Sequence, residues 1–172
     1  MRTQEQTNLT TYSDRITNTL YSTKVTAIGG RHGQIRSEDG LLDMKLALPR
    51  QLGGKGDATN PEQLLAAGWS SCFLSSIKIE AARMKVMLPA DLAVDAEVDL
   101  GATGGAYFLQ ARLNVSLPGL EREVAQALVD GAHQTCPYTK AIRGNISVVT
   151  NLVETGSATV TEYLLTPWDV AG

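Results

Sequence analysis

The chain has 172 residues, of which 43% are hydrophobic, and it carries a formal net charge of −3 at pH 7. This length suits one domain with a substantial core and is short for two. The acidic balance provides no surplus of basic side chains to neutralise phosphates, so the composition argues against a nucleic-acid partner. No uninterrupted run of roughly 18 apolar residues occurs, so we expect no membrane span and no membrane partner.

The N-terminal segment is polar and lacks the apolar stretch of a signal peptide. We therefore expect a cytoplasmic protein, in which a bond between the two cysteines is transient and redox-active rather than a structural staple. Three parts are predicted: a polar arm at 1–19, one domain at 20–154, and a tail at 155–172. The tail contains "TVTEYLL", which is compatible with an edge strand.

Strand and turn signals dominate the segment before residue 60. Residues 20–30 alternate and are rich in Thr and Val, which is typical of a strand. Residues 31–49 are broken by Gly33 and by Asp39-Gly40, a pattern that predicts a hairpin returning through "LLDMKLALP".

The strongest helix signal begins at residue 60. Asn60 is a good N-cap, Pro61 suits the first helical position, and Gln63 completes a capping box. We expect the helix to run to about Lys85. Apolar residues lie on most of its circumference, which predicts a buried, central helix. These residues are Leu64, Leu65, Trp69, Phe73, Ile77, Ile79 and Met84.

The remaining segments predict a second hairpin, a helix and a last strand. Residues 91–101 and 106–119 alternate on either side of "ATGG". Residues 119–134 have the apolar stripe of an amphipathic helix that covers a sheet. Residues 145–154 are predicted to form a strand. This order predicts an α+β fold with antiparallel sheets around a buried central helix.

Several catalytic and metal-binding motifs fail. "GWSSC" resembles a hydrolase nucleophile elbow, but Cys72 replaces the closing glycine and the segment lies inside a predicted helix. His32, Cys72, His133 and Cys136 could supply four zinc ligands, but they lack the usual closely spaced pairs on both sides. We expect no bound metal or other cofactor.

The two cysteines admit a structural and a reactive interpretation. A free cysteine is often a small buried hydrophobe. Cys72, however, is flanked on its helical face by Gly68, Ser75 and Ser76, which leave room near the sulfur. Apolar side chains nearby, Trp69, Phe73 and Leu65, could form a substrate pocket. Cys72 lies roughly three turns inside the helix, too far for the helix dipole to lower the pKa of its thiol.

A reactive Cys72 therefore needs a cation, and Arg31 is the candidate. It follows Gly29-Gly30, which lets the backbone approach another element. An exposed arginine at a turn is the alternative interpretation. Glu62 is a candidate partner for the guanidinium, or only an acidic residue that complements the start of the helix.

Three motifs in order, "DGLLDMKLALPRQLGG", "TNPEQLLAAGWSSCF" and "CPYTKAIRGNI", resemble the organic hydroperoxide resistance (Ohr) branch of the OsmC/Ohr family. The resemblance covers about residues 20–154. It implies an intertwined α+β homodimer that acts as a thiol peroxidase. This sequence departs from the family pattern in its polar arm, its tail, and Ser70-Ser71 before Cys72.

The resemblance also implies roles for single residues. Cys72 matches the peroxidatic position and Cys136 the resolving one, while Arg31 and Glu62 match the pair that tunes the thiol. Organic hydroperoxides, fatty-acyl or alkyl, would be reduced to alcohols through a sulfenic acid and an intramolecular disulfide. The electrons would come from an external dithiol, a lipoyl group. The alternative function is a redox-sensing or apolar-ligand-binding module without turnover.

Helix geometry adds a constraint. On one straight helix, Glu62 and Cys72 lie about 15 Å apart along the axis. Either the helix begins after Glu62, or Arg31 and Glu62 reach Cys72 from a partner chain.

Overall fold

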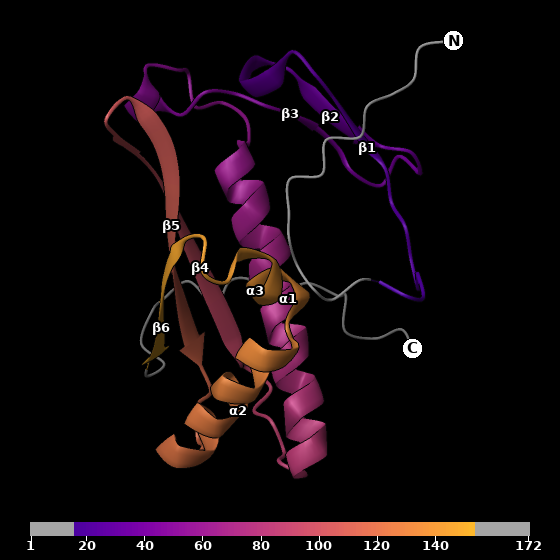
Figure 1. The fold of residues 1–172 in the computed structure, drawn as a ribbon, viewed down its shortest axis with the longest axis vertical. Coiled ribbons are helices and arrows are strands. Elements are labelled where there is room, and N and C mark those ends of the chain that lie inside the picture. The colour runs from indigo at the N-terminus through magenta and orange to yellow at the C-terminus, as the bar shows by residue number, and fades with distance from the viewer. Residues whose placement is uncertain (1–15, 154–172) are drawn as a thin grey trace.

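The structure is a computed structural model that describes residues 16–153. Most of the predicted arm and the whole predicted tail, including its edge strand, lie outside these residues. Figure 1 shows a small sheet at one end of a long helix, and a second sheet with two further helices along the rest of that helix. The order of elements within 16–153 is three strands, the long helix, a strand pair, two helices and a last strand.

The first sheet is antiparallel, as expected. It consists of β1 (Val25–Ile28), β2 (Gln34–Ser37) and β3 (Asp43–Lys45), paired in that order. The β2–β3 turn contains Gly40 at φ 75°, a left-handed conformation that favours glycine. Two short 3-10 helices, Gly30–His32 and Arg50–Leu52, follow β1 and β3. Strand β1 is shorter than the predicted 20–30.

Helix α1 spans Pro61–Met84, and its predicted limits are confirmed to within one residue. The Asn60 side chain accepts a hydrogen bond from the Gln63 backbone N–H at 2.9 Å, and Pro61 occupies the first turn. Lys85 ends the helix in a left-handed conformation, and its N–H donates to carbonyls of the last turn. These signals are local in sequence, which is why the pattern predicted them.

The second sheet corrects one prediction. Strands β4 (Ala93–Thr103) and β5 (Ala106–Ser116) form the expected antiparallel hairpin. Strand β6 (Ser147–Val153) instead pairs parallel to β5. The reason is the connection between them: α2 (Arg122–Thr135) and α3 (Pro137–Ile142) carry the chain back across the sheet, so that β6 re-enters in the direction of β5.

The core lies between this second sheet and the helices. Alternate residues of β5 point inward and are buried, in keeping with the period of a strand. They pack with the buried faces of α1 and α2, whose members recur at helical spacing. The fully or nearly fully buried members of this cluster are Trp69, Phe73, Ile77, Ala81, Ala111, Leu113, Val115, Leu128, Val129, Ala132 and Cys136.

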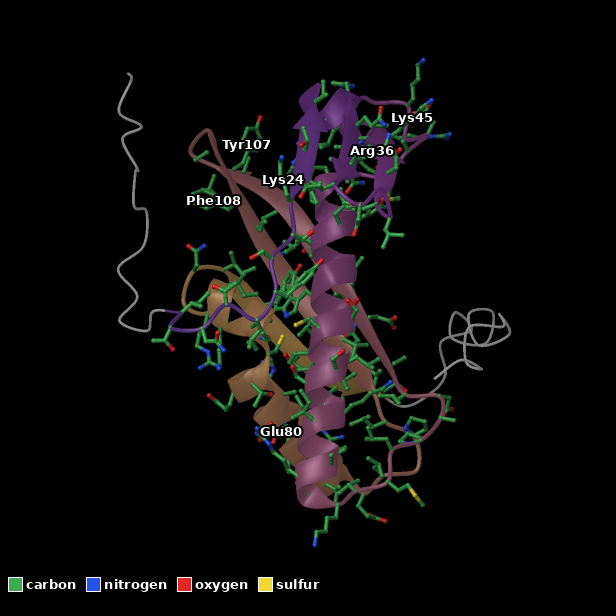
Figure 2. The ribbon with its side chains drawn as sticks, turned by 90° about the vertical axis from the view of Figure 1, so that its right-hand side faces the viewer. Lys24, Arg36, Lys45, Glu80, Tyr107 and Phe108 are labelled. Carbon is green, nitrogen blue, oxygen red and sulfur yellow. The ribbon has the colours of Figure 1, made fainter. Side chains whose placement is uncertain are left out.

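One chain leaves a good deal of apolar surface uncovered. Ile28 on β1 is 73% exposed and Ile79 on α1 is 50% exposed. Figure 2 shows Tyr107 and Phe108 at the tip of the β4–β5 hairpin, beyond the body of the second sheet. Exposed apolar surface of this extent is typical of an interaction surface.

In the part of the chain from 16 to 153, no helix combines the length and apolar character needed to cross a bilayer.

The cap of α1 generates a stability prediction. Asn60→Ala removes the acceptor for the Gln63 N–H, so we expect the free energy of unfolding to fall by about 1 kcal/mol. Urea denaturation at fixed protein concentration measures it. Asn60→Ser keeps a capping oxygen and should retain most of the stability. Equal midpoints for wild type and Asn60→Ala would contradict this role of the cap.

Candidate active site

The two cysteines, 64 residues apart in sequence, meet in the fold. Cys136 Sγ lies 3.6 Å from Cys72 Sγ, and both thiols are free. Cys136 is fully buried, whereas Cys72 is partly exposed. Since a disulfide bond is about 2.05 Å long, a small displacement would bring the sulfurs to bonding distance. Cys72 can contact a small molecule from the solvent, and Cys136 can contact the Cys72 sulfur from inside the core.

Cys136 owes its position to a helix junction. Its N–H donates to the Ala132 carbonyl at 2.9 Å, which completes α2, and the residue also stands as the N-cap of α3. The sequence analysis missed α3, whose six residues are too few for a periodic signal. Pro137 at its first position was the available indication.

Tyr138 fills space that the sequence analysis had assigned to an approaching molecule. A methyl group at Gly68 would lie only 2.6 Å from the Tyr138 hydroxyl oxygen. Gly68 is one turn before Cys72 on the same helical face, so the tyrosine ring lies beside the exposed thiol. Tyr138 is 40% exposed and therefore forms part of the surface around Cys72.

The serines around Cys72 satisfy their hydroxyls within α1. Ser71 donates to the Ala67 carbonyl at 2.8 Å, and Ser76 donates to the Cys72 carbonyl at 3.1 Å. Such bonds to the preceding turn keep a hydroxyl from competing for other partners. These positions therefore act as small side chains next to the sulfur, as the sequence predicted.

The electrostatic surroundings of Cys72 within one chain disfavour the thiolate. Burial raises the pKa of the Cys72 thiol, and the neighbouring Cys136 adds to this increase. A hydrogen bond from the Tyr138 backbone N–H acts in the opposite direction and lowers the pKa, but burial is the larger effect. The sequence predicts that Arg31 lowers this pKa, but within one chain the guanidinium is not among the groups that shift the pKa of Cys72.

Arg31 and Glu62 form a two-pronged ion pair. Arg31 Nη1 donates to Glu62 Oε2 at 2.8 Å, and Nη2 donates to Oε1 at 2.5 Å. The Glu62 side chain is only 14% exposed. The hydrogen bonds from Arg31 lower the pKa of Glu62, against the opposing effect of burial, so the carboxylate is ionised.

The ion pair and the thiol pair are separate in one chain. Because α1 begins at Pro61, Glu62 is inside the helix, and the predicted alternative of a later start is excluded. Ten residues of helix place Glu62 and Cys72 about 15 Å apart along the axis. Each chain therefore presents two half-sites.

The three residues predicted to line a substrate pocket differ in burial. Trp69 and Phe73 have no exposed surface in the chain, and Leu65 is half-buried. The Phe73 ring packs against His133, with centroids 4.8 Å apart. Trp69 and Phe73 thus support the Cys72 turn from inside the core. Their contact with a substrate stays a prediction.

A hollow of about 450 Å³ adjoins the ion pair, and sequence reasoning did not identify it. Glu62 lies on its wall, between the first turns of α1 and strand β4. Several of its other lining residues are apolar, including Leu52, Ala66, Ala96, Val98 and Leu100. The arginine half-site is therefore bordered by space that an apolar group could occupy.

Comparison with known proteins identifies the family. The model of the family described as "OsmC-like protein" matches residues 54–151. The organic hydroperoxide resistance protein of Xanthomonas axonopodis pv. citri is 46% identical over 134 residues, which cover 77% of this chain and 94% of that protein. The protein OhrB of Bacillus subtilis is 38% identical over 129 residues, covering 75% of this chain and 95% of that protein.

Solved structures give the same picture. An organic hydroperoxide resistance protein from Legionella pneumophila matches with a TM-score of 0.75 and 46% identity, over 78% of this chain and 98% of that one. One from Vibrio cholerae matches with a TM-score of 0.76 and 42% identity, over 80% of this chain and 95% of that one. The Vibrio structure holds captopril in one of its active sites.

The ion pair generates a pH-dependent stability prediction. Because Arg31 lowers the pKa of Glu62 in the folded state, the carboxylate stabilises the fold above its unfolded pKa of about 4.3. That contribution is lost as the pH falls through the lower folded pKa. The stability difference between wild type and Glu62→Gln should therefore be full at pH 6 and shrink in acid. Denaturant titrations across this range measure it.

The matched control for this experiment is Glu38→Gln, which removes an exposed carboxylate that lies 3.9 Å from Lys24. It changes the net charge equally without breaking the Arg31–Glu62 pair, so we expect a smaller effect at pH 6. A difference for Glu62→Gln that stays constant from pH 6 into strong acid would show that the ion pair is not its source.

Proposed function

Because this chain belongs to the OsmC-like family, in its organic hydroperoxide resistance branch, we propose that it is a cysteine-based peroxidase that reduces organic hydroperoxides to alcohols. The observation that carries the proposal is the pair of free thiols at 3.6 Å, one partly exposed and one fully buried. A sulfur that meets the oxidant and a second sulfur that closes a disulfide are the two parts that such a reaction requires.

In the first step the Cys72 thiolate attacks the distal oxygen of R–OOH. The O–O bond breaks, the alkoxide leaves and takes a proton as R–OH, and the sulfur is oxidised to a sulfenic acid. In the second step the Cys136 sulfur attacks the Cys72 sulfur. A disulfide forms, and the sulfenic oxygen leaves as water.

The first step needs a positive charge near Cys72, since burial raises the pKa of this thiol. We propose that Arg31, oriented by Glu62, supplies this charge from a partner subunit. The separation of the half-sites along α1 supports this arrangement, as does the apolar surface that one chain leaves exposed on β1 and α1. In a homodimer, the ion pair of each subunit would face the thiols of the other.

The substrate class follows from the family and from the apolar surroundings. We propose that the hollow beside Glu62 accepts the alkyl part of the hydroperoxide when a partner's thiols face it. The electrons that reopen the disulfide would come from an external dithiol, a lipoyl group, with no bound cofactor. Cytoplasmic location is part of the same proposal.

Single-cysteine variants test the assignment of the two sulfurs. Cys72→Ser should abolish peroxide reduction, because no sulfur remains to attack the oxidant. Cys136→Ser should reduce one equivalent and then accumulate sulfenic or sulfinic acid at Cys72. Mass spectrometry after one equivalent of cumene hydroperoxide distinguishes these products. If both variants lost the reduction of the first peroxide equivalent to the same extent, the assignment of Cys72 as the attacking sulfur and Cys136 as the resolving sulfur would be wrong.

Steady-state turnover separates the enzyme from the alternative of a sensor or binder. With dihydrolipoamide as reductant, the wild type should consume many equivalents of cumene hydroperoxide per Cys72. A protein that stops after one equivalent with every dithiol supplied would be a sensor. Replacing dihydrolipoamide with thioredoxin tests the choice of reductant.

Mixed dimers test the shared site. Cys72→Ser and Arg31→Ala chains should each be nearly inactive alone, because each lacks one half of every site. Refolded together, they should recover activity, since a heterodimer contains one site with both Arg31 and Cys72 intact. Native mass spectrometry establishes the heterodimer fraction. Proven heterodimers without recovered activity would place each site within a single chain.

A further inference from the structure

A buried hydrogen bond lies next to the thiol pair and takes no part in the chemistry described above. The indole Nε1–H of Trp69 donates to the Thr139 hydroxyl oxygen at 3.2 Å. Trp69 has no exposed surface, and Thr139 is 7% exposed. An indole N–H left unpaired in such a place would carry a desolvation cost, so the contact with Thr139 fixes a definite geometry.

This hydrogen bond connects the same two elements as the thiol contact. Trp69 precedes Cys72 on α1 by three residues, and Thr139 follows Cys136 by three residues, on α3. In each element the two groups are thus about one helical turn apart. Figure 1 shows α3 lying across the middle of α1. Fixing Thr139 against Trp69 therefore holds the start of α3 at the height of Cys72.

The step that depends on this placement is disulfide formation. Sγ of Cys136 begins 3.6 Å from Sγ of Cys72 and must close to about 2.05 Å. Until it does, a second hydroperoxide can oxidise the Cys72 sulfenic acid to a sulfinic acid, with release of a second alcohol. The outcome is a competition between an intramolecular step, whose rate depends on orientation, and a bimolecular step, whose rate depends on peroxide concentration.

We propose that the Trp69–Thr139 hydrogen bond is a positioning device for the resolving step: it holds α3 so that Cys136 captures the Cys72 sulfenic acid before overoxidation. In this role Trp69 and Thr139 are positioning residues, which act through Cys136, and both side chains are buried. The inference rests on the proposed peroxidase function and extends it to two residues on α1 and α3.

A merely structural role makes a different prediction. If the bond only adds stability, its loss lowers the free energy of unfolding and leaves the products of oxidation unchanged. If the bond positions Cys136, its loss changes the ratio of disulfide to sulfinic acid and leaves the first oxidation of Cys72 unchanged. The product ratio therefore distinguishes the two roles.

The experiment uses four single variants of the full chain and the double variant that combines Thr139→Val with Trp69→Phe. Thr139→Val removes the acceptor and keeps the shape, while Thr139→Ser keeps the hydroxyl. Trp69→Phe removes the donor. Val115→Ala, in the buried part of β5, is the stability control, because it removes core volume and leaves both hydrogen-bonding side chains in place. Each reduced protein receives increasing cumene hydroperoxide, and mass spectrometry gives the concentration at which half of Cys72 is sulfinic acid.

We expect Thr139→Val and Trp69→Phe to lower that concentration about five- to tenfold, the size expected from one uncharged buried hydrogen bond. The double variant should show little further change, because both substitutions break the same bond. Thr139→Ser and Val115→Ala should stay close to wild type. The rate of the first oxidation, followed at one equivalent, should be the same in wild type, Thr139→Val, Thr139→Ser and Val115→Ala.

The inference would be overturned if folded Thr139→Val needed the same hydroperoxide concentration as wild type to convert half of Cys72 to sulfinic acid. It would also be overturned if Val115→Ala lowered that concentration as much as Thr139→Val does. If Trp69→Phe fails to fold, the comparison of Thr139→Val with Thr139→Ser still tests the positioning role. Failure of the proposed function itself would be seen in the wild type, as an absence of any disulfide after one equivalent. A wild type that forms the disulfide, with variants that form it equally well, counts against the positioning role alone.

Discussion

Helix α1 fixes Glu62 and Cys72 about 15 Å apart along one axis, because an α-helix rises 1.5 Å per residue and bends little. Arg31 pairs with Glu62, so within one chain the guanidinium is held at the Glu62 end of this separation. This separation is the reason for proposing that a second subunit completes the site. The exposed apolar faces of β1 and α1 are consistent with that requirement.

Burial has opposite consequences for the two cysteines. In the proposed mechanism, full burial suits Cys136, which must avoid the oxidant and needs only to reach another sulfur. For Cys72 burial is a cost, because it raises the pKa of a thiol that must ionise to react. A cation that approaches only on assembly would make the thiol reactive in the dimer and sluggish in the isolated chain.

The sequence predicted those features whose signals are local. The start of α1 follows from Asn60 and Pro61, and its end at about Lys85 from the last apolar positions of the helix pattern, whereas the left-handed conformation of Lys85 was not predicted. The hairpins follow from alternation and from glycine-containing turns. The parallel pairing of β6 was missed, because a strand's direction depends on the connection that precedes it. Helix α3 was missed because six residues hold less than two turns of pattern.

The candidate site was predicted unevenly for the same reason. The motif resemblance identified the two cysteines and the ion pair, and the fold brings the members of each pair together. The occupant of the space at Gly68 could not be predicted, since Tyr138 is 70 residues away and reaches it only through α3. The hydrogen bond between Trp69 and Thr139 could not be predicted either, because the apolar pattern of the helix does not indicate a partner for the indole N–H of Trp69.

The burial of Trp69 gives the protein an internal optical reporter. The chain has two tryptophans, and the other, Trp168, lies outside the described residues. The indole of Trp69 sits one turn from Cys72 and donates to α3, so its emission is sensitive to the loss of that hydrogen bond and to the sulfur nearby. In a Trp168→Phe background, fluorescence would report the state of this hydrogen bond and of the Cys72 sulfur in real time, without a label and on the millisecond scale of a rapid-mixing instrument.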